Sequence, residues 1–213
     1  MTITTITQGG ISGFLHETDG APQAGLVLTH GAGANCRAPL IVAVAEAFAA
    51  NGFAVLRCDL PFRQRKPGGP PTRSTAGEDR AGLRQAAAFL RARFPGAPVV
   101  MGGHSYGGRQ ATMLAAEEFG VADALLLLSY PLHVPDKPEK LRTEHFPQLR
   151  TPALFVHGTK DPFGTPQEMR KALALIPGRH EVQFIEGAAH DLRRPAFDLD
   201  VVVAEIIRLL SGS

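Results

Sequence analysis

The feature that most constrains the fold is a Gly-x-Ser-x-Gly motif at residues 103–107, with Ser105 at its centre. It follows a short apolar run, residues 99–101, and directly precedes residues 109–119, whose apolar positions recur at helical spacing. A sharp strand-to-helix turn of this kind lifts the serine hydroxyl out of a sheet, and the small flanking residues avoid collisions with the strained backbone. The pattern predicts a buried strand, a tight turn that exposes a nucleophile, and a helix.

Apolar strand-like runs alternate with amphipathic segments along the rest of the chain. Continuous apolar strands suit a parallel sheet buried on both faces, with helical crossovers between them, so the fold class is α/β. The expected strands are residues 26–29, 54–57, 99–101, 124–129, 153–156 and 182–185. The expected helices are residues 39–51, 75–94, 109–119, 166–175 and 199–210. The first sixteen residues alternate around Gly9-Gly10 and predict an antiparallel edge hairpin.

Length and composition favour a single domain over residues 1–213. A net charge of +2 gives no electrostatic argument for a nucleic-acid or membrane-surface partner. Cys36 and Cys58 fall in predicted structured regions and are expected to be reduced buried thiols. Residues 1–10 resemble no signal peptide and no apolar run is long enough to span a membrane, so a cytoplasmic protein is expected. The sequence says nothing of its oligomeric state.

A serine hydroxyl is a weak nucleophile at neutral pH and needs a base. Asp161 and His190 each come just past a predicted strand, and the chain order Ser, Asp, His is that of hydrolases with such a turn. We predict Ser105 as nucleophile, His190 as general base and then acid, and Asp161 as the group that orients the imidazole. Asp191 adjoins the base in sequence and Asp198 begins the last helix, so both are poorer candidates for the acid.

Acyl transfer also needs donors for the negative charge that develops on the carbonyl oxygen, and fixed backbone amides supply them. The loop His-Gly-Ala-Gly-Ala at residues 30–34 follows the first buried strand, so the predicted oxyanion hole consists of the amides of Ala32 and Tyr106. This loop has neither of the glycine spacings that cradle phosphates. The histidines lack the paired spacing of a zinc motif and no Cys-x-x-Cys occurs, so no metal and no cofactor is expected.

Two stretches interrupt the alternation, residues 61–73 and 132–150, and both are candidate pocket walls as well as ordinary loops. His30, Tyr130 and His133 are candidates for lining the pocket, with structural packing as the alternative. The first stretch also contains four basic residues that could attract an anionic substrate or simply be solvated. They are Arg63, Arg65, Lys66 and Arg73.

Four motifs together resemble the α/β-hydrolase fold superfamily. They are residues 30–34, 103–107, 158–161 and 187–190. Residues 128–133 and 140–146 are similar to a small group of predicted hydrolases that includes bacterial proteins, testis-expressed homologues and a subunit of the NSL chromatin complex. The resemblance implies a mostly parallel sheet with helices on both faces and a short excursion in place of a lipase-like lid. It implies no substrate, and some members of the group act as scaffolds.

The sequence therefore predicts a serine hydrolase, carboxylesterase-like or thioesterase-like, that acts on small-molecule esters or thioesters through an acyl-enzyme. The alternative is a non-catalytic interaction protein that retains the fold. The two hypotheses differ in how complete the set of catalytic residues should be. A protein that no longer catalyses a reaction has no need to keep nucleophile, acid, base and oxyanion loop together.

Overall fold

An eight-stranded sheet with the order β1-β2-β4-β3-β5-β6-β7-β8 runs through the computed structural model, which describes residues 2–212. β1 and β2 are antiparallel and join the sheet through β4, whereas all neighbours from β4 to β8 are parallel. The strands are β1 Thr2–Gln8, β2 Ile11–Glu17, β3 Ala24–Thr29, β4 Phe53–Cys58, β5 Val99–His104, β6 Ala124–Leu128, β7 Ala153–Gly158 and β8 His180–Ile185. The predicted α/β class is confirmed, and each expected strand is present.

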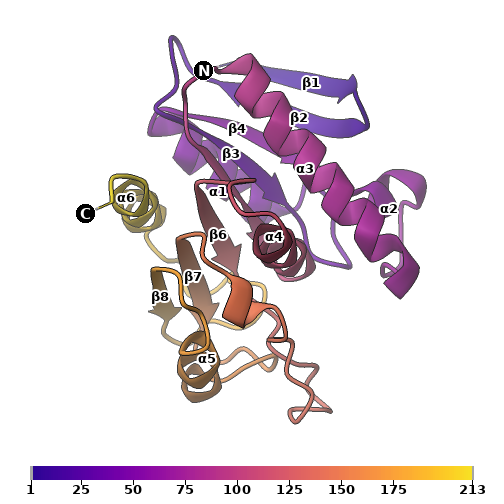
Figure 1. Ribbon diagram of the computed structural model, residues 1–213, viewed down its shortest axis with the longest axis vertical. Helices are drawn as coiled ribbons and strands as arrows, with labels where there is room; N and C mark the ends of the chain where they lie inside the picture. Colours follow the sequence, from indigo (N-terminus) through magenta and orange to yellow (C-terminus); the bar gives the residue numbers. More distant parts are fainter. Residues whose placement is uncertain (1, 213) are drawn as a thin grey trace.

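Helices cover both faces of the sheet (Figure 1). α1 and α6 pack on one face, and α3, α4 and α5 pack on the other. Their bounds are α1 Pro39–Ala50, α3 Ala76–Arg93, α4 Tyr106–Glu117, α5 Pro166–Leu173 and α6 Leu199–Leu210. All five were expected from the sequence, and none of their ends differs by more than three residues.

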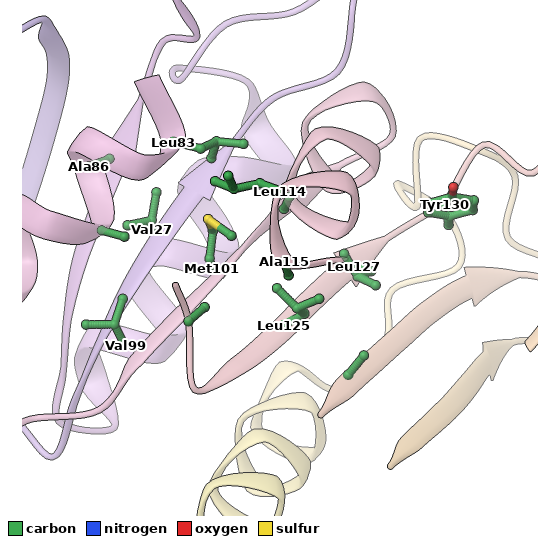
Figure 2. Close-up of a cluster of buried hydrophobic side chains, with 14 of the residues drawn as sticks. Val27, Leu83, Ala86, Val99, Met101, Leu114, Ala115, Leu125, Leu127 and Tyr130 are labelled. Atoms are coloured by element: carbon green, nitrogen blue, oxygen red, sulfur yellow. The ribbon is translucent and has the colours of Figure 1, made fainter. Parts of the chain in front are cut away.

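The core forms because alternate residues of each strand point to opposite faces. Val27 and Met101 point toward Leu83 of α3 and Leu114 of α4 (Figure 2). Val100, the neighbour of Met101, packs instead in the cluster under α1 and α6. Burying each large aliphatic side chain is worth about 1.5–3 kcal/mol. Since both faces are covered, the central strands read as continuous apolar runs rather than alternating ones.

The predicted edge hairpin is also confirmed. β1 and β2 pair from Thr2 opposite Glu17 to Gln8 opposite Ile11. The two glycines between them, Gly9 and Gly10, have φ of 58° and 75°. Two successive residues with positive φ form the tight turn whose twist matches the strands it joins, and glycine adopts that conformation without steric cost.

Two helix positions differ from expectation. A short helix, α2 (Pro61–Arg65), lies within a stretch predicted as loop, and it begins with a proline whose fixed φ suits the first helical position. α4 begins at Tyr106, three residues earlier than expected, because Gly107 and Gly108 lower helix propensity in a sequence reading. Packing requires the first of them, since a Cβ there would lie 2.4 Å from Oγ1 of Thr29.

Two long irregular stretches follow the carboxyl ends of β4 and β6. The first contains α2 and the 3-10 turn η1 (Arg73–Thr75), and the second contains the 3-10 turn η2 (Phe146–Gln148). In Figure 1 the second extends beyond α4 and α5 as a loop excursion rather than as a cap domain over the sheet. Within residues 2–212 no helix has both the length and the apolar character needed to cross a membrane.

Candidate active site

Ser105 occupies the tight turn between β5 and α4. Its φ of 50° and ψ of −111° lie outside the regions that residues with a side chain prefer. The neighbouring chain leaves room only for glycine at the flanking positions. A Cβ on Gly103 would lie 2.4 Å from the carbonyl oxygen of Thr29, and one on Gly107 would lie 2.8 Å from that of His30. The turn expected from the motif is therefore present, with the serine at its tip.

The structure brings the side chains of Ser105, His190 and Asp161 together. Nε2 of His190 lies 2.9 Å from Oγ of Ser105. Nδ1 of the same ring lies 2.8 Å and 3.0 Å from the two carboxylate oxygens of Asp161. A carboxylate oxygen accepts, so Nδ1 carries the proton and Nε2 is free to accept one from the serine hydroxyl. This is the geometry that a serine–base pair needs for nucleophilic attack.

The carboxylate of Asp161 is held in place from a second side. It is 3% exposed, and Oδ1 also accepts from the backbone amide of Phe163 at 2.9 Å. The two rival carboxylates lie elsewhere. Asp191 pairs with Arg193, and Asp198 caps the first turn of α6. Of the three, only Asp161 contacts the imidazole in the described part of the chain.

Two aromatic rings fix the position of His190. The ring of Phe163 stacks on it at a centroid distance of 4.2 Å and an angle of 30°. His104 supports the backbone, because its Nε2 donates to the carbonyl oxygen of His190 at 2.7 Å. Burial lowers the pKa of His104 to about 4, so the residue beside the nucleophile is a neutral hydrogen-bond donor at pH 7. His104 therefore has a scaffolding role in the described structure.

The loop at residues 30–34 passes directly beside Ser105. A Cβ on Gly31 would lie 2.9 Å from Nδ1 of His104 and 3.6 Å from Cβ of Ser105, so this approach depends on glycine. Ala32 and Tyr106 both line the cleft that contains the serine. Tyr106 is the first residue of α4, where a backbone amide has no partner within the helix. The two residues predicted to supply oxyanion donors thus both line the cleft that contains Ser105.

A buried arginine holds this loop from behind. Nη2 of Arg63 donates to the carbonyl oxygen of Ala32 at 2.7 Å, and Nε donates to that of Ala34 at 2.7 Å. The same guanidinium reaches the carbonyl oxygens of Lys66 and Gly69. Arg63 is 5% exposed and all four partners are backbone carbonyls. It ties the stretch after β4 to the loop after β3.

This placement bears on the two alternatives for the basic stretch, which are attraction of an anionic substrate and simple solvation. Arg63 binds backbone carbonyls inside the protein, and Arg65 forms an ion pair with Glu78. Lys66 is exposed and does not line the cleft. The side chain of Arg73 lies outside the described residues. None of the described members of the cluster lines the cleft, since Arg63 is buried among backbone carbonyls and Arg65 and Lys66 are exposed elsewhere. A helix as short as α2 contains too few residues for its hydrophobic periodicity to show in the sequence which of these side chains are buried.

A second buried charge was missed by the sequence reasoning. Asp79, in the first turn of α3, is fully buried and accepts from the hydroxyl of Tyr106 at 2.7 Å and from the amide of Phe62 at 2.9 Å. Burial, first of all, raises the pKa of Tyr106, so its hydroxyl remains a donor. Asp79 therefore holds Tyr106, the residue predicted to supply one of the two oxyanion amides. An acidic residue in a first helical turn is common and gave no signal of this contact.

His30, Tyr130 and His133 do not line the cleft in the described structure. His30 is fully buried, donates from Nδ1 to the carbonyl oxygen of Gly31 and accepts at Nε2 from the amide of Leu60. Tyr130 donates to the carbonyl oxygen of Arg142 at 2.6 Å. His133 is 4% exposed, with its ring nitrogens bonded to Val134 and Glu168. The packing alternative describes all three, since each polar atom named here is satisfied within the protein.

The cleft above Ser105 has a volume of about 1400 Å³. Both irregular stretches contribute to its walls, as expected from their position after parallel strands. The first supplies Pro70 to Thr72, and the second supplies residues from Pro131 to Glu144. Phe163 and His190 complete the lining beside the serine.

Comparison with solved structures places the whole chain in one fold. A dienelactone hydrolase from Anabaena variabilis superimposes with a TM-score of 0.76 at 22% identity, covering 99% of this chain and 97% of that one. Est1E from Butyrivibrio proteoclasticus gives 0.75 at 19% identity, with 99% of each chain covered. An a/b serine hydrolase without lid from Xanthomonas campestris gives 0.69 at 14% identity, covering 99% of this chain and 94% of that one.

A family model described as "Alpha/beta hydrolase domain" matches residues 22–202. The match takes in the loop after β3, the turn at Ser105, and the segments that carry Asp161 and His190. Together with the mostly parallel sheet and the lack of a cap domain in the described residues, it settles the classification. The chain belongs to the α/β-hydrolase domain family.

Proposed function

We propose that the protein is a serine hydrolase that cleaves small esters or thioesters through an acyl-enzyme on Ser105. One observation carries the proposal: Oγ of Ser105, the ring of His190 and the carboxylate of Asp161 form a continuous hydrogen-bonded chain at the floor of an open cleft. The esterase and dienelactone hydrolase among the structural neighbours support the same reaction class. The free, buried Cys36 and Cys58 agree with a reducing, cytoplasmic compartment.

In the first half-reaction Oγ of Ser105 bonds to the acyl carbon while its proton moves to Nε2 of His190. The carbonyl oxygen becomes an oxyanion, which accepts from the amides of Ala32 and Tyr106. Asp161 accepts from Nδ1 and stabilises the imidazolium. The bond to the leaving oxygen or sulfur then breaks, and the leaving group takes the proton from Nε2.

In the second half-reaction water attacks the acyl-enzyme and gives a proton to Nε2 of His190. Collapse of the tetrahedral intermediate releases the carboxylic acid, and Oγ of Ser105 recovers its proton from the ring. No other reactant is needed. The open cleft without a cap domain favours small, soluble substrates over long acyl chains, so acetate to butyrate esters are the expected starting point.

The alternative is an interaction protein that retains the fold, which the resemblance of residues 128–133 and 140–146 allows. Against it stands the cost of the turn at Ser105, whose backbone is held in a disfavoured region. A binding module gains nothing from that strain or from a serine hydroxyl aligned with an imidazole.

The test compares Ser105→Ala with Ser211→Ala, a serine at the far end of α6. We expect Ser105→Ala to abolish hydrolysis of an activated acetate ester and labelling by a fluorophosphonate, with little change in thermal midpoint. Ser211→Ala keeps both activities. Undiminished turnover in Ser105→Ala, or a wild-type protein that is inert to the label and to short esters while co-purifying with a stable partner, would favour the interaction protein.

A further inference from the structure

Beyond Ser105, the helix α4 presents one stripe of side chains to the cleft. Tyr106, Arg109, Gln110 and Met113 all line it. They are spaced by three and four residues, which places them on one helical face. Arg109 lies four residues after Ser105, so the helix rise separates their Cα atoms by about 6 Å along the axis. The nucleophile and a guanidinium thus face the same space one helical turn apart.

Arg109 has no partner for its charge. Within residues 2–212 its guanidinium makes no hydrogen bond or ion pair, and Nε is buried without an acceptor. Guanidinium carries five donors and no acceptor, and leaving a buried donor unpaired has a substantial free-energy cost. Folded proteins rarely retain such a group without a reason, and at a cleft wall the missing acceptor can come from a ligand.

Arg142 lines the same cleft from the excursion after β6. Its side chain makes one long contact, from Nη1 to the carbonyl oxygen of Pro131 at 3.4 Å, and no ion pair in the part of the chain that is described. The pKa of Arg142 is lowered by burial and then by the positive charge of Arg109, so the two guanidinium groups are close enough to repel. The fold keeps two like charges close together, and no carboxylate of the described residues forms an ion pair with either.

The surrounding groups leave this charge uncompensated. His145 packs nearby, and burial together with Arg109 and Arg80 lowers its pKa to about 4, so it is neutral at pH 7. Glu144 lies on the same loop as Arg142 and raises its pKa, but stands beyond ion-pair distance. The other acids of the lining are the exposed Glu139, on the outer part of the loop, and Asp191, which is engaged with Arg193.

Gln110 adds a second buried donor without an acceptor, after Nε of Arg109. It is fully buried, and Oε1 accepts from Nη1 of Arg80 at 3.2 Å, which orients Nε2 the other way. Nε2 has no acceptor within the described residues. On the same cleft wall, Nε of Arg109 and Nε2 of Gln110 therefore lack an oxygen acceptor, and Arg142 makes only its one long contact with Pro131.

We infer that Arg109 and Arg142, with Nε2 of Gln110, form a carboxylate-binding subsite, and that the substrates are esters or thioesters of short dicarboxylic acids with their second carboxylate free. This inference rests on the proposed function and names its substrate class. A planar carboxylate accepts from guanidinium in a bidentate manner, and the pair is charge-assisted. The separation of about one helical turn lets a short chain reach from the acyl carbon at Ser105 to the subsite.

The first experiment compares two esters of equal length, the 4-nitrophenyl monoester of glutaric acid and its methyl-capped, neutral counterpart. We expect kcat/KM to be at least 10-fold higher for the free carboxylate, and the preference to shrink with added salt. Arg109→Gln and Arg142→Gln should each lower the ratio of the two kcat/KM values about 10-fold, while Arg109→Lys, which keeps the charge but not the fork, retains part of it. Lys171→Gln, an exposed lysine of α5, removes the same charge elsewhere and should leave the ratio unchanged.

A wild-type ratio near one, or a ratio that neither arginine variant alters, would overturn the subsite. If the neutral ester is nevertheless turned over in a Ser105-dependent way, the proposed function stands and only the substrate class fails. A binding measurement covers the case in which neither ester is cleaved. Calorimetry on Ser105→Ala should detect glutarate but not dimethyl glutarate, and adding Arg109→Gln should weaken glutarate binding at least 10-fold. Equal binding with and without Arg109 would contradict the inference without any reference to catalysis.

Discussion

Nη2 of Arg63, a residue that does not line the cleft, donates to the carbonyl oxygen of Ala32 at 2.7 Å. The amide of Ala32 is one of the two proposed oxyanion donors, so a residue remote from the substrate sets the position of a group that would contact it. Oxyanion stabilisation depends on donors fixed before the charge develops. Arg63 is accordingly a positioning residue.

We predict that Arg63→Gln lowers kcat roughly 10- to 100-fold with little change in KM, because the loop would lose its position rather than its contacts with the ground state. The free energy of unfolding should fall by about 1–3 kcal/mol, since buried carbonyls lose their donors. Arg65→Gln, on the same short helix, is the control. Its exposed ion pair with Glu78 is worth under about 1 kcal/mol, and kcat should not change. Equal kcat losses in the two variants would argue against positioning.

Asp161→Asn tests the orientation of the imidazole. An amide in place of the carboxylate can hold Nδ1 of His190 in the wrong protonation state and cannot stabilise an imidazolium. We expect kcat to fall by about three to four orders of magnitude, with KM changed only a few-fold. Steady-state kinetics on a short activated ester provide the measurement. A loss below 10-fold would exclude Asp161 as the partner of the base.

Gly31→Ala probes the close approach of the loop to the nucleophile. The new Cβ would meet Nδ1 of His104 at 2.9 Å, so the loop must retreat. We expect kcat to fall at least 10-fold, which is the order of effect that a small misplacement of catalytic groups produces. Gly33→Ala, where a Cβ has nothing within 4 Å, should reduce kcat far less. The idea fails if both alanine variants behave alike.

His104 should make stability depend on acidity. Its pKa is about 4 in the folded protein against an ordinary 6.5, owing to burial, so between these values the unfolded chain binds a proton that the folded one does not. Stability is fully present above pH 6.5 and falls as the pH drops toward 4, by up to roughly 3 kcal/mol. His145 and His16, each with a pKa of about 4, act in the same direction.

His104→Gln can keep a donor toward the carbonyl oxygen of His190 but removes the titration. Urea unfolding from pH 4.5 to 7.5 should show a shallower decline in the free energy of unfolding than in the wild type, by about one proton. The two proteins should converge in slope above pH 7. Parallel curves over the whole range would mean that His104 does not resist protonation in the folded state.

Hydrophobic patterning was sufficient to predict the sheet and its main helices, because strands buried on both faces leave unbroken apolar runs in the sequence. The turn at Ser105 could be recognised since its glycines answer a steric demand that few other arrangements make. The sequence also allowed us to predict that three side chains lie close together, those of Ser105, Asp161 and His190. Each follows a parallel strand, and the carboxyl ends of parallel strands share one edge of the sheet.

The supporting contacts could not be predicted in this way. The partners of Arg63 are backbone carbonyls, and a backbone partner leaves no mark on residue identity. Asp79 and Arg109 looked like ordinary polar residues of helices, since their burial depends on how α2 and the excursion after β6 fold over them. His30 and Tyr130 were placed near the correct region, but which way a side chain turns there is decided by packing.

The backbone at Ser105 has a φ of 50°, a conformation that lowers the stability of the fold but holds the hydroxyl in the position needed for reaction. Glycine adopts this conformation without steric conflict. Selection of variants for heat resistance alone would therefore favour glycine in place of the serine, and the hydroxyl would be lost. Under the proposed function, serine at this turn serves chemistry rather than folding. Attempts to stabilise the protein should therefore begin far from the turn at Ser105, on the surfaces of the helices and in the edge hairpin.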